Sequence, residues 1–261
     1  MTSSVQIVFV FVFGCVVGSF LNVVRYRLPR KAGMVSGRSM CPQCGRRIAW
    51  YDNVPILSYL VLKGRCRQCG WGILGIYPVI EASTGVSFAL IWYSFLPGQA
   101  VAYMVLAALL IACAGIDFDL RIIPDKLTLP GIVLGLLFSV TLLKTGPVDR
   151  SLVRSLLGIV AGGGTLFAVA VLYKLVRRIE GMGGGDVKLM AMAGAFLGYE
   201  LALLTIFVAS VAGGIIGLFL IRRSSEGMKT SVPFGVFLSP AGIFCLLWGD
   251  ALIGAYLNLI K

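Results

Sequence analysis

Residues 4–24 read SVQIVFVFVFGCVVGSFLNVV, an apolar run without a charged side chain. A transmembrane helix needs about 20 consecutive, mainly apolar residues. The rest of the chain has the same character, because 58% of its 261 residues are hydrophobic and only 13% are charged. A typical soluble domain has about 25% charged residues. The sequence therefore predicts an integral membrane protein.

Further apolar runs follow the first, and they predict an all-α polytopic fold with about eight transmembrane helices. The sixth run has only about a dozen residues, so a buried or partial span is an alternative there. The eight runs are 4–24, 72–95, 99–116, 127–143, 152–173, 187–198, 201–221 and 234–257. We divide the chain into a first transmembrane helix (1–24), a cytoplasmic loop (25–71) and a transmembrane core (72–261).

Basic residues set the predicted orientation. No Lys or Arg precedes the first apolar run and several follow it, which is the reverse of a cleavable signal peptide. Nineteen of the 23 Lys and Arg residues fall in alternate loops, at 25–71, 117–126, 174–188 and 222–233. By the positive-inside rule these loops face the cytoplasm, and both chain ends lie outside. The net charge of +12 thus indicates topology and attraction to anionic lipid headgroups, not nucleic-acid binding.

The loop 25–71 contains the repeated cysteine pattern C-x2-C-x21-C-x2-C, in which CPQCGRRI at 41–48 aligns with CRQCGWGI at 66–73. Four thiolates on two such turns are typical of a tetrahedral zinc site that is closed to chemistry. Two disulfides are the alternative, but they are uncommon in the reducing cytoplasm. We therefore expect a small zinc-ribbon-like loop with structural zinc. The predicted ligands are Cys41, Cys44, Cys66 and Cys69.

Carboxylates occur in two groups where an apolar run meets a predicted cytoplasmic loop. IDFDLRIIPDK at 116–126 follows the third run, and GMGGGDVK at 181–188 opens the sixth. Two facing carboxylates share one proton, so one can serve as base and the other as acid. This chemistry needs no histidine, which the chain lacks. The sequence therefore predicts an aspartic pair with one member from each group.

Other readings of these carboxylates stay open. Asp186 could simply be an acidic residue in the first turn of a helix, where the helix dipole favours negative charge. Asp117 could simply form an ion pair with Arg121. Acidic residues beside a broken helix also suit a cation site in a transporter, although the two halves of the chain show no matching interrupted spans. Lys188 either pairs with Asp186 or extends toward the lipid headgroups.

The sequence resembles the type IV prepilin peptidase family, a group of GxGD-type aspartyl membrane proteases. The resemblance is carried by GSFLNVVRYRLP at 18–29, by the cysteine pairs around DNVPILSY at 52–59, and by GGGD at 183–186. It extends to PFG at 233–235. G-x-G-D alone is a weak signal, but its combination with D-x6-P-D from residue 117 and the four cysteines is specific.

The resemblance implies a bifunctional enzyme of the bacterial inner membrane. Such an enzyme removes the basic leader of type IV prepilins or type II secretion pseudopilins at the cytoplasmic face, then N-methylates the new terminus with S-adenosylmethionine. The family's catalytic pair maps onto Asp117 and Asp186, whereas the residues alone do not separate Asp117 from Asp119. Residues 72–261 would form the peptidase core. The glycines expected to admit the substrate backbone are Gly183, Gly184 and Gly185.

Two points lie outside the motif match. Glu81, in the second apolar run, is either an orienting or methyl-transfer residue or a partner for a neighbouring helix. The chain has no G-x-G-x-x-G between a strand and a helix, so methyl transfer rests on resemblance alone. A cation-coupled membrane transporter and a non-catalytic secretion or pilus assembly factor are the alternative functions.

Overall fold

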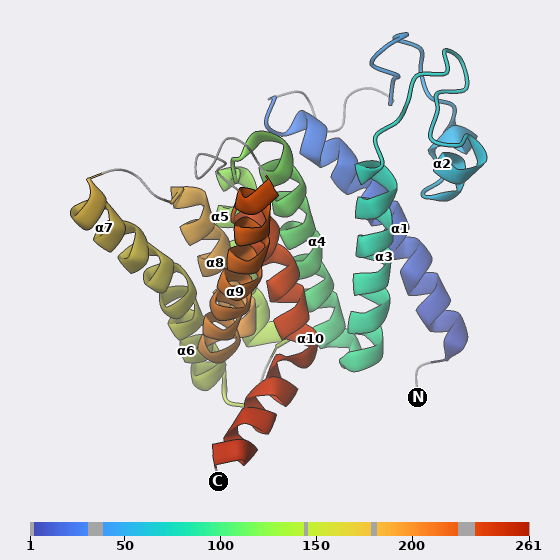
Figure 1. The fold of residues 1–261 in the computed structure, drawn as a ribbon. Helices are drawn as coiled ribbons and strands as arrows, with labels where there is room; N and C mark the ends of the chain where they lie inside the picture. The colour runs from blue at the N-terminus through green and yellow to red at the C-terminus, as the bar shows by residue number, and fades with distance from the viewer. Residues whose placement is uncertain (1–2, 31–38, 144–145, 179–181, 224–232, 261) are drawn as a thin grey trace. The chain divides into compact units, whose positions relative to one another are not determined.

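The computed structural model describes residues 3–30, 39–143, 146–178, 182–223 and 233–260, which are helical apart from short turns and loops (Figure 1). The chain divides into two compact units. We call them the N-terminal unit (Met1–Phe95) and the C-terminal unit (Leu96–Lys261). The prediction of an all-helical chain is confirmed.

The N-terminal unit is built on two paired helices, α1 (Ser4–Arg27) and α3 (Ile76–Ser94). Glycines let the two backbones approach closely, since a Cβ atom on Gly18 would lie 2.7 Å from the Cα atom of Glu81. Small residues serve the same purpose in other membrane helix pairs. The intervening loop carries a 3-10 helix, η1 (Trp50–Asn53), and the short α2 (Leu57–Val61).

The C-terminal unit is a bundle of helices. Pro97 starts the first of them, at a position where its missing N–H group costs nothing. The sixth predicted run, 187–198, corresponds to the fifth helix of this bundle, and the predicted run 152–173 corresponds to two helices joined by one π turn. The elements are α4 (Pro97–Leu120), α5 (Asp125–Thr141), α6 (Val148–Ile159), the π turn η2 (Val160–Gly164), α7 (Thr165–Arg177), α8 (Gly184–Leu197), α9 (Tyr199–Arg223) and α10 (Gly235–Ile260).

Helix α8 forms the core of this bundle. Every residue from Leu189 to Leu197 is buried, because α4, α5, α6, α9 and α10 all pack against it. Its closest neighbour is α6, where the backbone at Gly158 touches the backbone at Gly194 and leaves no space for a side chain. With 14 residues at about 1.5 Å each, α8 is about 21 Å long. It is therefore shorter than a hydrocarbon layer of about 30 Å, and it spans such a layer only where the lipid is thinned.

Among the residues that the structure describes, five helices are long and apolar enough to cross a membrane: Ser4–Arg27, Pro97–Leu120, Val148–Arg177, Tyr199–Phe219 and Gly235–Leu259. The predicted spans 127–143 and 187–198 are also helices, but α5 and α8 have only 17 and 14 residues. The predicted span 72–95 is α3, which carries the polar residue Glu81 and several hydroxyl groups. A helical chain with candidate membrane-spanning segments is thus confirmed, whereas the full set of eight spans is not.

Candidate active site

Asp117 and Asp119 lie in different surroundings at the end of α4. The helix continues one turn beyond the predicted end at residue 116 and stops where Arg121 adopts a left-handed conformation with φ 56°. Asp117 is only 5% exposed, whereas Asp119 is exposed. Burial therefore separates the two aspartates that the residue pattern alone left equivalent, and it selects the one that the motif match had indicated.

Asp186 is the third residue of α8, and it is partly buried at the end of α8 that faces α4. Burial, and to a smaller extent the nearby charge of Asp117, raise the pKa of Asp186 to about 6. Since α4 packs against α8, the structure brings together two carboxylates that are remote in sequence. A carboxyl group with a pKa near neutrality can hold a proton for acid–base chemistry.

The first turn of α10 completes the surroundings of Asp117. The backbone amides of Gly235 and Val236 lie within hydrogen-bonding range of its carboxylate, although its Oδ2 atom makes no well-aligned hydrogen bond among the described residues. Arg121 adds a positive charge. Sequence analysis did not assign a role to α10, although a proline before a helix and the glycine at its start are both visible as PFG at 233–235.

Lys188 does not pair with Asp186, which was one of the two alternatives for this residue, but with another carboxylate. Its Nζ atom lies 2.8 Å from both Oδ1 and Oδ2 of Asp125, the first residue of α5. Residues two apart on a helix point to different sides, which explains why Lys188 and Asp186 meet different neighbours. The ion pair joins the first turns of α5 and α8.

The three glycines before Asp186 differ in the space around them. A Cβ atom on Gly184 would meet nothing within 4 Å, and one on Gly183 would meet only light contacts at 3.9 Å. Gly185 instead packs on Ile123, whose Cβ atom would be 2.9 Å from an added Cβ. Room for an approaching chain therefore exists at Gly183 and Gly184, while Gly185 serves helix packing.

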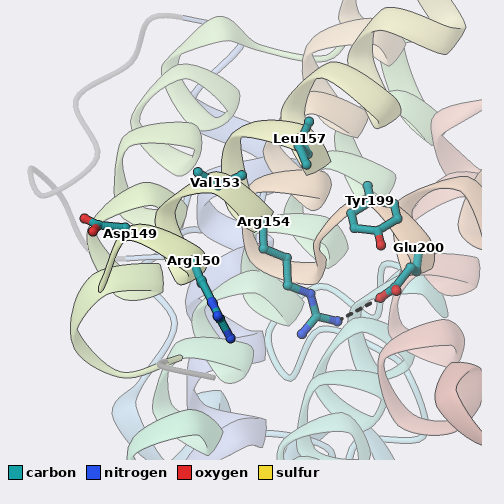
Figure 2. Close-up of a pocket in the computed structure, with 7 residues that line it drawn as sticks. All are labelled: Asp149, Arg150, Val153, Arg154, Leu157, Tyr199 and Glu200. Carbon is teal, nitrogen blue, oxygen red and sulfur yellow. Dashed lines mark hydrogen bonds and ion pairs between the residues drawn. The ribbon is translucent and has the colours of Figure 1, made fainter. Parts of the chain in front are cut away.

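A separate pocket lies between α6 and the first turn of α9 (Figure 2). Within it the Nη2 atom of Arg154 is 3.2 Å from Oε2 of Glu200. Neither Asp117 nor Asp186 lines it, so it is distinct from the aspartate pair. Its lining residues are Asp149, Arg150, Val153, Arg154, Leu157, Tyr199 and Glu200.

The four loop cysteines form a compact cluster in the N-terminal unit. Their sulfur atoms lie within 4.8 Å of one another, and those of Cys41 and Cys69 are 3.8 Å apart. With Zn–S bonds of about 2.3 Å, the edge of a tetrahedral site is about 3.8 Å. All cysteines of the chain are free thiols. The donor set and its spacing therefore fit zinc and do not fit the predicted alternative of two disulfides.

Both C-x2-C turns have the same local geometry. Gly45 and Gly70 have φ angles of 66° and 71°, which glycine adopts without a steric penalty. In each turn the glycine amide donates to the carbonyl of the first cysteine at 2.9 Å, from Gly45 to Cys41 and from Gly70 to Cys66. The repeat seen in the sequence is therefore a structural repeat.

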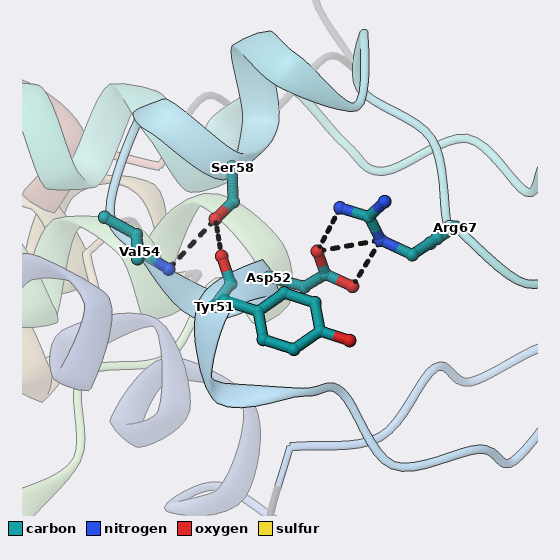
Figure 3. A network of polar contacts seen from close by, with 5 residues as sticks. All are labelled: Tyr51, Asp52, Val54, Ser58 and Arg67. Atoms are coloured by element: carbon teal, nitrogen blue, oxygen red, sulfur yellow. Dashed lines mark hydrogen bonds and ion pairs between the residues drawn. The ribbon is translucent and has the colours of Figure 1, made fainter.

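A polar network holds the segment between the cysteine pairs (Figure 3). Arg67 binds Asp52 through two of its nitrogens, with Nη2 2.7 Å from Oδ1. Asp52 thereby raises the pKa of Arg67. The hydroxyl of Ser58 accepts from the Val54 amide and donates to the Tyr51 carbonyl, each at 3.0 Å. These contacts connect the inserted segment to the second cysteine turn.

Glu81 connects this loop to the helix pair. Its carboxylate is buried and accepts a hydrogen bond of 2.7 Å from the Ile56 amide, and it also interacts with the Ser19 hydroxyl. Ile56 has φ 60° and ψ −51°, and the Leu57 amide reaches the Pro55 carbonyl across it. This is a γ-turn of the rare, strained kind. Of the two predicted uses of Glu81, its contacts favour the structural one.

Comparison with known proteins gave matches along most of the chain. Residues 12–95 match the Bacterial Peptidase A24 N-terminal domain, and residues 104–218 match the Type IV leader peptidase family. The prepilin leader peptidase/N-methyltransferase of Pseudomonas putida is 37% identical over 95% of this chain and 93% of its own length. The enzyme of the same name from Pseudomonas aeruginosa is 38% identical over 94% of this chain and 91% of its own length. The one from Aeromonas hydrophila is 35% identical over 95% of this chain and 93% of its own length.

This chain belongs to the type IV leader peptidase family. In this family member the first match falls within the N-terminal unit and the second within the C-terminal unit. The second match contains both Asp117 and Asp186, while Gly235 lies beyond it. No solved structure matches the chain.

Proposed function

We propose that the chain is an aspartic prepilin peptidase that also N-methylates its product. The substrates are type IV prepilins or type II secretion pseudopilins. The buried pair Asp117 and Asp186 carries the proposal, together with the printed names of relatives that match over nearly the whole chain. The names of these relatives give no support to a cation-coupled transporter or to a non-catalytic assembly factor.

In the proposed reaction the two aspartates share one proton. The ionised member, which we take to be Asp117, removes a proton from a water molecule whose oxygen attacks the scissile carbonyl. Asp186 donates its proton to the carbonyl oxygen as the tetrahedral intermediate forms. As the C–N bond breaks, the proton taken up by Asp117 passes to the leaving amine, and a hydroxyl of the tetrahedral intermediate returns its proton to Asp186, which restores the starting pair. The raised pKa of Asp186 supports its assignment as the proton-carrying member.

The proposed location is the bacterial inner membrane. Eight crossings, with both termini outside, place the loops that follow α4 and precede α8 on the cytoplasmic side, according to the distribution of Lys and Arg. The basic loop 25–71 would then lie near anionic lipid headgroups. Residues 72–261 would form the peptidase core.

We propose that Cys41, Cys44, Cys66 and Cys69 hold one structural zinc ion, which would stabilise the loop fold. Zinc analysis of the purified protein should give one ion per chain, and Cys41→Ser or Cys66→Ser should lose it. Cys245→Ala is the matched control, since this buried thiol lies in α10. A full zinc content in the Cys41→Ser and Cys66→Ser variants would contradict the site.

Neither the Glu81 carboxylate nor the pocket between α6 and α9 marks a binding site for S-adenosylmethionine among the described residues. Glu81, the buried carboxylate of the N-terminal unit, is already engaged by Ile56 and Ser19. The pocket between α6 and α9 carries two arginines and two carboxylates, of which Arg154 and Glu200 are paired with each other, so its charge does not favour a cationic sulfonium donor. Methyl transfer therefore enters the proposal through the relatives' names, and no step is assigned to particular residues.

Isosteric substitutions test the aspartate pair. Asp117→Asn and Asp186→Asn should each abolish leader removal from a co-expressed type IV prepilin, because neither amide can exchange the shared proton. Asp119→Asn is the matched control and should leave processing intact, since Asp119 is exposed. Mass spectrometry of the pilin reports leader loss and methylation together. Normal processing by either of the first two variants would overturn the aspartic mechanism.

A further inference from the structure

We infer that the first turn of α10 is a third component of the active site, in which Gly235 is a positioning residue that holds two backbone amides against Asp117. The inference rests on the proposed role of Asp117. It goes beyond that role because it assigns a function to a helix that contributes no carboxylate to the aspartate pair.

The approach of α10 to Asp117 depends on the missing side chain at residue 235. Gly235 is buried, and a Cβ atom there would lie 2.7 Å from Oδ2 of Asp117 and 2.9 Å from Cδ1 of Ile123. At these distances an added Cβ would force the ends of the Asp117 and Ile123 side chains to move, so an alanine at residue 235 displaces the carboxylate from the amides. The amides of Gly235 and Val236 reach the carboxylate only because this space is open.

Asp117 needs such a partner because of its own position. It lies in the last turn of α4, where the helix dipole places partial negative charge and disfavours a carboxylate. It is also buried, and its Oδ2 atom makes no well-aligned hydrogen bond among the described residues. The first turn of α10 brings the positive end of another helix, with free amide donors, to this carboxylate.

The other charged groups around Asp117 do not replace α10. Among the described residues, α4 offers Asp119 and Arg121, of which Arg121 acts on Asp117. From α8 come Asp186, which interacts with Asp117, and Lys188, which is paired with Asp125 of α5. Lys126 of α5 is exposed, and the first turns of α10 carry no charged side chain. The amides of α10 are thus the donors that stabilise an ionised Asp117.

Gly235→Ala tests the inference, with Gly254→Ala as the control in the same helix, where an added Cβ would meet nothing within 4 Å. We expect Gly235→Ala to lower kcat for leader removal at least tenfold while the protein still inserts and unfolds cooperatively. Loss of amide stabilisation should also move the acidic limb of the pH–kcat profile upward by about one pH unit. Gly254→Ala should leave both the rate and the profile unchanged.

A double variant separates positioning from packing. Ile123→Val removes the Cδ1 atom that an alanine at residue 235 would strike, so it relieves that clash and leaves the one with Asp117. We expect Gly235→Ala combined with Ile123→Val to fold well and stay impaired, with the shifted pH profile. Recovery of normal kinetics in the double variant, or a normal rate and profile in Gly235→Ala alone, would overturn the inference. Activity in Asp117→Asn would instead overturn the proposed function.

Discussion

Asp186 shows how burial of one residue links stability to pH. The pKa of Asp186 is raised to about 6, compared with about 3.9 for an aspartate in an unfolded chain. Between about pH 4 and pH 6 the folded protein therefore binds more protons than the unfolded chain. The free energy of unfolding then falls as the pH rises through this window, because the buried carboxylate becomes charged.

We predict that Asp186→Asn is more stable than the wild type at pH 7 to 8, by on the order of 1–2 kcal/mol. At pH 4 the two proteins should have the same stability, since Asp186 is then protonated in the wild type. Thermal unfolding in detergent micelles between pH 4 and pH 8 measures the difference. A stability difference that is the same at every pH would show that Asp186 does not titrate in this range.

The aspartate pair could be predicted from sequence only with the help of the family motif. Asp117 and Asp119 are equally placed in the residue pattern, and they differ only in which side of the last turn of α4 they occupy. The ion-pair partner of Lys188 could not be predicted from the residues adjacent to it in sequence. Asp125 is 63 residues away along the chain and lies beside Lys188 because α5 packs on α8. Cysteine spacing, by contrast, was sufficient for the metal cluster, since the pattern itself fixes the local turns.

At the scale of elements, the γ-turn at Ile56 is held by a single buried carboxylate. An isoleucine in a strained conformation persists only when its surroundings impose it, and here the Glu81 carboxylate binds the amide of the strained residue. Removal of the carboxylate would leave a polar amide without its partner, at a cost of about 1–3 kcal/mol. This contact thus ties the loop to the α1 and α3 pair.

We predict that Glu81→Ala loosens the loop while α1 and α3 stay paired. Hydrogen exchange at the Ile56 amide should become faster by one to two orders of magnitude, in line with about 1–3 kcal/mol of lost protection. Ser83→Ala is the matched control on the same helix, because the Ser83 hydroxyl bonds only to the Ile80 carbonyl one turn away. Unchanged exchange at Ile56 in Glu81→Ala would mean that the turn is held by other contacts.

Element boundaries were predictable to within one turn in most cases, but the π turn was not. The single predicted span 152–173 is divided at Val160–Gly164, where the wider turn lets Gly162 and Gly163 lie against α8. A scan of hydrophobicity cannot detect a change in hydrogen-bonding register, because the apolar character is the same in α and π turns. The glycine run was the only visible signal.

At the scale of the whole molecule, the number of membrane crossings decides where the chain ends. Eight crossings put Lys261 on the same side as the N-terminus, whereas only the five helices that meet the length and hydropathy requirement would put it on the opposite side. The difference arises from α3, α5 and α8, which are helical but shorter or more polar than usual spans. Sequence alone could not decide their depth, because depth depends on packing.

We predict an even number of crossings, since the distribution of Lys and Arg requires it. A reporter enzyme that is active only outside the cytoplasm, fused after Lys261, should therefore be active, and the same reporter fused after Arg223 should be inactive. The second fusion controls for export of the reporter itself. The opposite result at both positions would support an odd number of crossings.

The shortness of α8 also bears on the surrounding lipid. Helix α8 is about 21 Å long, with Asp186 in its first turn and Tyr199 two residues beyond its last, so these two polar groups are separated by less than a normal hydrocarbon layer. Lipid around this unit must thin, or the reacting carboxylates must lie beneath the headgroup plane. The rate of the enzyme should consequently respond to acyl-chain length in reconstituted vesicles, with shorter chains giving the substrate an easier route to the aspartates.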